Sequence, residues 1–185
     1  MKFKHWGIRL TEQRAAAWPG ARGDSSEAPE IWYRALSVHA PVDVLFRWVC
    51  QLRVAPYSYD WIDNWGRQSP RYLVDGLDQL RIGQKVMTIF RVQDFLTDHY
   101  LILALWPPRG FFCSDLRLTY LCKRIADEKA RLMVRVEIRY PKHPFRFLIR
   151  LLLPIGDLLM MRKQLLTLKR LAERHIGDER SFCER

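Results

Sequence analysis

The chain has 185 residues, 49% of them hydrophobic, and its seven Trp residues are part of that share. This length and composition predict one globular domain with a buried core and exclude intrinsic disorder. The formal net charge is +11 at pH 7, and residues 123–174 hold most of it, with fourteen Lys and Arg against five Asp and Glu.

The basic last third predicts a surface that is either solvated or in contact with an acidic partner. An anionic membrane surface and an acidic protein are both open as partners. Nucleic acid is disfavoured, because the sequence contains no RNP signature, no GXXG loop in a KH pattern and no zinc finger. No pattern in the chain predicts an oligomeric state.

Cysteine spacing and the apolar stretches bear on location. The four Cys, at positions 50, 113, 122 and 183, show neither C-x-x-C spacing nor a matching His pair, which disfavours zinc and favours reduced thiols. A disulfide between Cys113 and Cys122 is the alternative. The N-terminus lacks the apolar run of a signal peptide, and charged residues and Pro154 interrupt residues 145–161. We therefore expect a cytoplasmic protein without a membrane span, with peripheral membrane association left open.

The first third of the chain predicts an arm, a strand and a helix. Residues 1–30 combine Gly and Pro with little periodicity, which predicts an N-terminal arm that packs on the body and has an irregular middle. Residues 31–38 are rich in β-branched and aromatic residues and predict a strand. Pro41 and Asp43 are typical of a helix start, and apolar residues then recur at helical spacing until the helix ends near Pro56.

The middle of the chain predicts an antiparallel sheet. Residues 57–66 are the densest aromatic segment and predict a short helix or turn. Four strand candidates follow, joined by short polar links, as antiparallel neighbours require: residues 85–92, 99–106, 111–122 and 131–140. Residues 99–106 are apolar on both faces, so we expect a central strand covered on two sides or a dimer contact. Residues 131–140 alternate, so we expect one buried face and one solvated face.

The last segment predicts a long amphipathic helix. Apolar residues recur every three or four positions from about residue 144 to about residue 174, and Arg and Lys fill the other face. Pro154 and Gly156 are expected to kink or break this helix. The body would then span residues 31–175, and residues 176–185 would form a flexible tail.

Several strings of residues carry a resemblance to a known family. The most specific are Tyr57-Ser58-Tyr59-Asp60-Trp61 and Leu168-Lys169-Arg170-Leu171-Ala172-Glu173, accompanied by Val38-His39-Ala40-Pro41 and Leu80-Arg81-Ile82-Gly83-Gln84. Taken together, the chain resembles the bacterial polyketide cyclase and dehydrase-like branch of the SRPBCC superfamily, the START-related helix-grip proteins. This resemblance implies an α+β fold in which a curved antiparallel sheet wraps around a long C-terminal helix. It also implies short helices between the first two strands and a deep cavity under the helix.

Members of that superfamily bind lipids, sterols, polyketides, hormones or quinones, and a minority catalyse cyclisation or dehydration. Aromatic groups with a polar handle can cover an apolar ligand and orient its polar end, and the apolar stripe of the last helix would floor the cavity. The predicted ligand-binding residues are Tyr57, Tyr59, Asp60, Trp61, Trp65, Trp106, Leu151, Ile155, Leu158, Leu159 and Met161. Plain core packing is the alternative for these groups, and helix capping is the alternative for Asp60.

The sequence indicates binding in preference to catalysis. His99, beside Asp98, together with His143 and Glu137, are the acid–base candidates, and their spacing does not demand cooperation. No H-E-x-x-H, G-x-S-x-G, P-loop or dinucleotide fingerprint is present, so we predict no catalytic residue, no metal and no cofactor. The favoured function is a carrier or sensor of an apolar small molecule, such as a lipid, polyketide or quinone. A cyclase or dehydratase type of enzyme and a membrane-peripheral or protein-interaction module are the alternatives.

Overall fold

The computed structural model describes residues 5–7, 18–20, 29–59, 61, 66–87, 89–106, 115–140 and 146–183. A curved seven-stranded sheet has the order β1-β2-β7-β6-β5-β4-β3. Its strands are β1 (His5–Trp6), β2 (Glu30–Val38), β3 (Lys85–Val86), β4 (Phe90–Leu96), β5 (Tyr100–Leu105), β6 (Asp115–Ala126) and β7 (Lys129–Arg139). The helices are α2 (Val42–Cys50), the short 3-10 helix η2 (Gln51–Arg53) and α4 (Arg146–Cys183).

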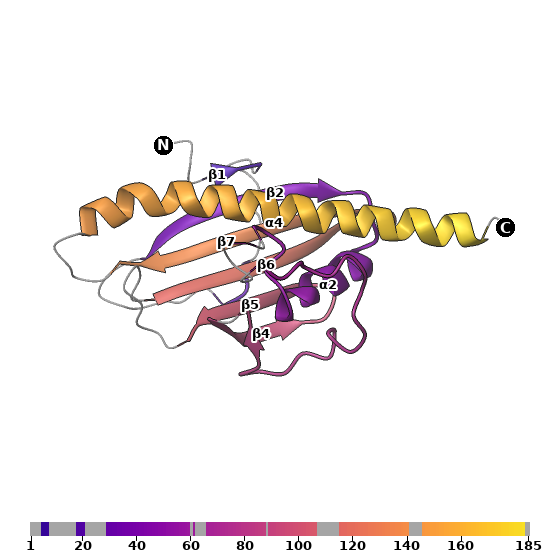
Figure 1. Cartoon of the computed structure of the whole chain (residues 1–185), viewed down its shortest axis with the longest axis horizontal. Helices are drawn as coiled ribbons and strands as arrows, with labels where there is room; N and C mark the ends of the chain where they lie inside the picture. Colours follow the sequence, from indigo (N-terminus) through magenta and orange to yellow (C-terminus); the bar gives the residue numbers. More distant parts are fainter. Residues whose placement is uncertain are drawn as a thin grey trace.

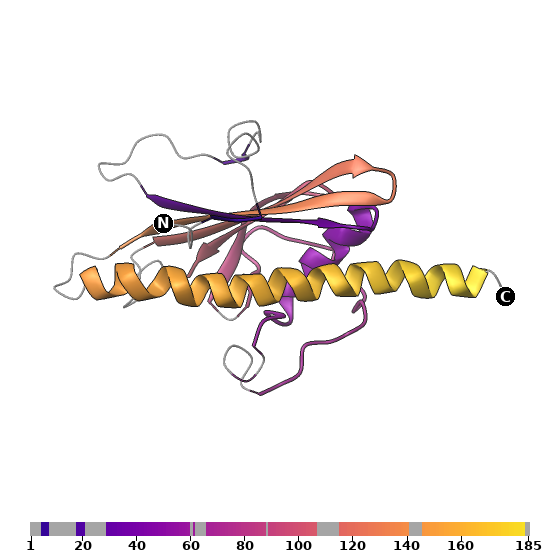
Figure 2. The same cartoon turned by 90° about the horizontal axis from the view of Figure 1, so that it is seen from above.

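The sheet and α4 form two layers. Figure 1 shows α4 crossing one face of the sheet, with α2 beside its second half, and Figure 2 shows the same two layers from above. Strands β2 to β7 pair antiparallel, and only β1 pairs parallel, with β2. Register shifts in the β4–β5 and β6–β7 pairs mark bulges, which increase strand twist. This is the α+β helix-grip architecture that the resemblance implies.

The core lies between the sheet and the two helices. Leu132, Val134 and Val136 of β7 and Leu165 and Leu168 of α4 belong to one hydrophobic cluster, and all five are fully buried. The period of two in the strand and the period of three to four in the helix each place apolar groups on one side. Burying a Leu, Val or Phe side chain stabilises the fold by about 1.5 to 3 kcal/mol, so this interface is a main source of stability.

The second face of β7 is buried, which corrects the expectation of a solvated face. Arg135 and Glu137 lie on this face with nearly all of their surface covered, and Arg135 pairs with Glu137 at 2.5 Å. The neighbouring Arg117 of β6 donates to the backbone oxygen of Gly20, whose segment lies against the sheet here. The alternating charges predicted a solvated face because the sequence pattern of a strand does not show whether a distant segment covers that strand.

Strand β5 is a central strand, as its two apolar faces predicted. Leu101, Ile102 and Leu103 are all fully buried although they point to alternate faces. The strand candidate at residues 85–92 is instead divided into β3 and β4, with Met87 in a left-handed conformation between them at φ 45°. Two of the four thiols, Cys50 and Cys122, are buried and free, and burial raises the pKa of Cys50 to about 12. Cys113 lies outside the described residues.

Pro154 and Gly156 were expected to kink or break α4, and the helix continues through both without a break. It runs for 38 residues and ends at Cys183, beyond the expected end near Arg174. One proline removes one backbone hydrogen bond, and packing of the flanking turns on the sheet outweighs that loss. Within the described part of the chain, no helix is long and apolar enough to cross a membrane.

Candidate functional site

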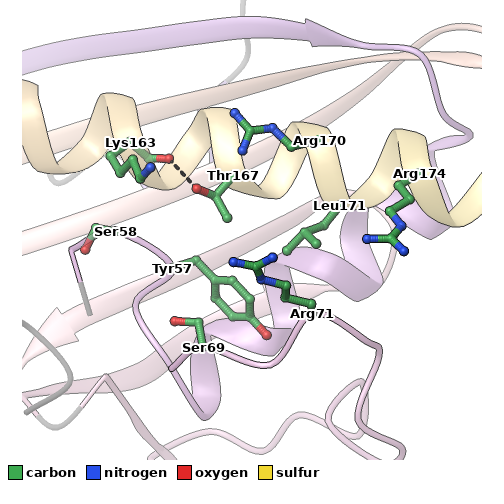
Figure 3. Close-up of a pocket in the computed structure, with 9 residues that line it drawn as sticks. All are labelled: Tyr57, Ser58, Ser69, Arg71, Lys163, Thr167, Arg170, Leu171 and Arg174. Carbon is green, nitrogen blue, oxygen red and sulfur yellow. Dashed lines mark hydrogen bonds between the residues drawn. The ribbon is translucent and has the colours of Figure 1, made fainter. Parts of the chain in front are cut away.

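A pocket of about 220 Å³ lies between the second half of α4 and the segment that follows η2. Figure 3 shows Tyr57, Ser69 and Arg71 across from Thr167 and Leu171 of the helix. The residues that line the pocket are Tyr57, Ser58, Ser69, Arg71, Lys163, Thr167, Arg170, Leu171 and Arg174. The pocket therefore combines cations and hydroxyl groups with one aromatic ring and one leucine.

Helical spacing builds one wall of the pocket. Lys163, Thr167, Arg170 and Arg174 follow one another at intervals of four, three and four residues, which places them on one side of α4. The hydroxyl of Thr167 donates to the backbone oxygen of Lys163 at 2.8 Å, so it is anchored to the helix (Figure 3). The wall is consequently as firm as the helix that carries it.

A strained residue begins the opposite wall. Tyr57 has a φ of 55°, a left-handed conformation that is uncommon for a residue other than glycine. Its side chain is buried, and its ring meets Trp48 of α2 edge-on, with ring centroids 6.3 Å apart. Strain of this kind persists only where surrounding packing holds it, and it gathers at functional sites.

The end of α2 and the following 3-10 helix hold the rest of this wall in place. The side chain of Gln51 exchanges two hydrogen bonds with the backbone of Val74, at 3.0 and 3.3 Å. Arg53 donates to the backbone oxygens of Gly76 and Leu77 at 3.0 and 2.9 Å, and to that of Gln79 at 3.3 Å. These bonds clamp the irregular segment 66–80, which carries Ser69 and Arg71.

The pocket is strongly electropositive. It has four cationic side chains, and among the described residues that line it none is acidic. Arg174 pairs with Asp178 at 3.5 Å. Arg71, Lys163 and Arg170 make no ion pair within the part of the chain that the structure describes. Cations gathered around a small hollow repel one another, so an anion bound among them would relieve that repulsion.

A second group of polar side chains lies between the sheet and α4. Arg34 of β2 is fully buried and donates to the Asp157 carboxylate at 2.9 Å. Burial raises the pKa of Asp157 to about 6, although the nearby Arg34 opposes that rise. Tyr120 donates to the Gln164 side chain at 2.8 Å, which in turn donates to the backbone oxygen of Pro56 at 2.6 Å. Neither Arg34 nor Asp157 lines the pocket.

Of the predicted aromatic residues that the structure describes, Tyr57 alone lines the pocket. Tyr59 is half-buried, and Trp61 is exposed. Trp106 follows β5, where it is exposed and the Arg91 guanidinium lies 4.5 Å from its ring centroid. Asp60 and Trp65 lie outside the described residues.

The predicted apolar residues of α4 are divided between two sides of the helix. Met161 is buried in the core, and Leu158 is half-buried. Leu151, Ile155 and Leu159 are exposed. Binding of a ligand by these residues stays a prediction.

Eight of the nine pocket residues were not predicted as site residues, and the four cations are among them: Arg71, Lys163, Arg170 and Arg174. The spacing of Lys163, Arg170 and Arg174 along the helix is a signal that could have grouped three of them. Arg71 has no such signal, because only the fold brings it to α4. Among the described residues no cluster of His, Cys, Asp or Glu could hold a metal ion.

Comparison with known proteins places the fold. No protein-family model matches the chain, and no curated protein matches it. A Thermobifida fusca protein solved by solution NMR is 12% identical with a TM-score of 0.54, covering 78% of this chain and 93% of that one. The di-domain aromatase/cyclase BexL of the BE-7585A biosynthetic pathway is 13% identical with a TM-score of 0.50, covering 78% of this chain and 46% of that one. This chain thus spans about half of that two-domain protein, and the comparisons show that it has the helix-grip fold.

Proposed function

We propose that the protein binds a small organic molecule with an anionic group, as a carrier or sensor. Arg71, Lys163 and Arg170 contact the anion, and Tyr57 and Leu171 contact the apolar part of the molecule. The observation that carries this proposal is the pocket of about 220 Å³ with four cations and, among its described lining, no carboxylate.

The size and fold support a compact ligand. Pockets that enclose drug-sized molecules measure about 300 to 1,000 Å³, so the smaller volume here suits a phosphate or carboxylate on a short carbon skeleton. The aromatase/cyclase that shares the fold supports an aromatic or polyketide-like skeleton. A cyclase or dehydratase activity has less support, because the polar pair of Arg34 and Asp157 does not line this pocket.

Calorimetric titration with phenyl phosphate, and with neutral benzyl alcohol as the matched control, tests the proposal. We expect phenyl phosphate to bind and benzyl alcohol not to bind, because only phenyl phosphate has a negative charge that can pair with the cations of the pocket. Lys163→Gln or Arg71→Gln removes a charge-assisted hydrogen bond and should raise the Kd about tenfold. Ligand at a hundred times its Kd should also stabilise the fold by about 2.7 kcal/mol.

Arg81→Gln is the matched control variant, because Arg81 is an exposed arginine that does not line the pocket. It lowers the net charge by the same amount and should leave the Kd unchanged. Equal weakening by Arg81→Gln and Lys163→Gln would mean that the overall charge, and not this pocket, attracts the anion. Equal binding of benzyl alcohol would also contradict the proposal.

A further inference from the structure

The first half of α4 exposes an unusual number of large apolar side chains. Within thirteen residues, six are exposed: Phe147 79%, Leu148 51%, Leu151 48%, Leu152 57%, Ile155 39% and Leu159 54%. We call these six the apolar outer face. Single exposed leucines are normal on a soluble protein, but a contiguous group marks an interaction surface.

Helix geometry places the six residues together. At 3.6 residues per turn they fall within an arc of about 140° around the helix axis. The buried residues Ile149, Pro154 and Met161 lie outside this arc, on the remaining part of the helix surface. Figure 2 agrees, because near the start of α4 the described strands lie on one side of the helix only.

Positive charge continues the same side of the helix. Arg162 and Lys163 follow the apolar outer face at helical spacing, and both are exposed. Residues 146–172 contain six Lys and Arg and a single acid, Asp157, which pairs with Arg34 on the sheet side. Along the outer side of α4, the apolar residues come first and the two cationic residues follow toward the C-terminus.

We infer that the outer side of α4 docks on the surface of an anionic lipid bilayer. The apolar outer face enters the boundary between headgroups and acyl chains, and Arg162 and Lys163 contact lipid phosphates. An amphipathic helix with Phe and Leu on one part and Lys and Arg beside it binds bilayers in this way. The inference rests on the exposed side chains and does not depend on a ligand in the pocket.

Charge favours lipid over a second copy of the chain. In a two-fold contact centred on Leu152, Arg162 and Lys163 would face the start of the second α4. The start of α4 carries Arg146 and Arg150 and no acid, and Glu30 neutralises only Arg150, so net positive charge would meet at both ends of such a contact. An anionic bilayer is instead complementary to both the apolar outer face and the cationic residues that follow it.

Flotation of the full-length protein with vesicles tests the inference. Phosphatidylcholine vesicles are compared with vesicles that also contain about 30% phosphatidylserine. We expect binding to be about tenfold stronger to the anionic vesicles and to be lost at high salt, because screening weakens the attraction of lysine and arginine to the surface. Binding that does not depend on lipid charge would overturn the inference.

The variant Phe147→Ser/Leu152→Ser removes two exposed side chains and should weaken vesicle binding at least about tenfold. Ile82→Ser/Ile125→Ser is the matched control, because both residues are exposed elsewhere and should not affect binding. Equal vesicle binding by the two variants would overturn the inference. So would a wild-type dimer that dissociates in Phe147→Ser/Leu152→Ser, because a second copy would then cover the face. Arg71→Gln separates the two proposals, since it should bind phenyl phosphate about tenfold more weakly and bind vesicles as the wild type does.

Discussion

At the scale of single residues, the ion pair between Arg34 and Asp157 links the sheet to α4. Its two charges are 2.9 Å apart in a layer made mostly of apolar side chains. Burial raises the pKa of Asp157 from 3.8 to about 6, above its unfolded value. The folded protein therefore holds this proton between about pH 4 and pH 6, where the unfolded chain has released it. The contribution of Asp157 to the free energy of unfolding should fall as the pH rises through that range.

Arg34→Leu should extend this decrease in stability to higher pH. Without the guanidinium, the buried carboxylate has lost its cationic partner, so the pKa of Asp157 rises further and ionisation opposes folding more strongly. We expect a loss of about 3 kcal/mol at pH 8 and a smaller loss at pH 5, measured by urea unfolding at both values. Asp157→Asn is the control, because it removes the titration between pH 4 and pH 6. An equal loss at pH 5 and pH 8 in Arg34→Leu would show that the pair does not set the pH response.

At the scale of elements, the short 3-10 helix η2 that follows α2 positions the pocket without lining it. Arg53 is bonded to three backbone oxygens of the segment 66–80, and that segment carries Arg71. The predicted end of the helix near Pro56 indicated where the chain changes direction. It did not indicate that Arg53 holds a segment some 25 residues further on, because hydrogen bonds to a distant backbone leave no periodic pattern in the sequence.

Arg53→Met should weaken anion binding indirectly. The aliphatic part of the side chain is kept, but the three backbone oxygens lose their donor, so the segment 66–80 should become more mobile. We expect a loss of about 1 to 2 kcal/mol of stability and a weaker affinity for phenyl phosphate, with faster amide hydrogen exchange in this segment. Lys163→Gln, which touches the ligand, should weaken binding without changing that exchange. Unchanged affinity in Arg53→Met would mean that Arg71 is positioned by other contacts.

At the scale of the whole molecule, segments near the N-terminus contact both the β2 edge of the sheet and the face that lies away from α4. Strand β1 pairs with β2, and the ring of Trp18 lies 5.4 Å from that of Tyr33. The backbone oxygen of Gly20 accepts from Arg117, beside the buried pair of Arg135 and Glu137. Both faces of the central strands are consequently covered, and the two layers of the fold depend on residues at the two ends of the chain.

A variant that lacks residues 1–20 should therefore be less stable. It loses the half-buried Trp6 and Trp18, so we expect a decrease of about 3 kcal/mol in the free energy of unfolding, measured by urea denaturation. Gly20→Ala is a milder companion, because Gly20 has a φ of 64° and an added Cβ would lie 3.0 Å from Ile102; it should lose about 1 kcal/mol. An unchanged denaturation midpoint in the truncated variant would show that these contacts do not stabilise the body.

Local patterns of residues were enough to predict the type and order of the main elements. The alternation in β7, the apolar faces of β5 and the helical spacing in α4 depend on neighbouring residues, and local geometry converts them directly into strands and helices. Which sides of these elements are covered depends instead on how the elements pack together. The tertiary structure buried the charged side of β7, exposed Leu151 and Leu159 of α4, and brought Arg71 to Lys163 across 92 positions of sequence. Burial and charge clusters of this kind depend on contacts between distant segments, and a local pattern carries no record of them.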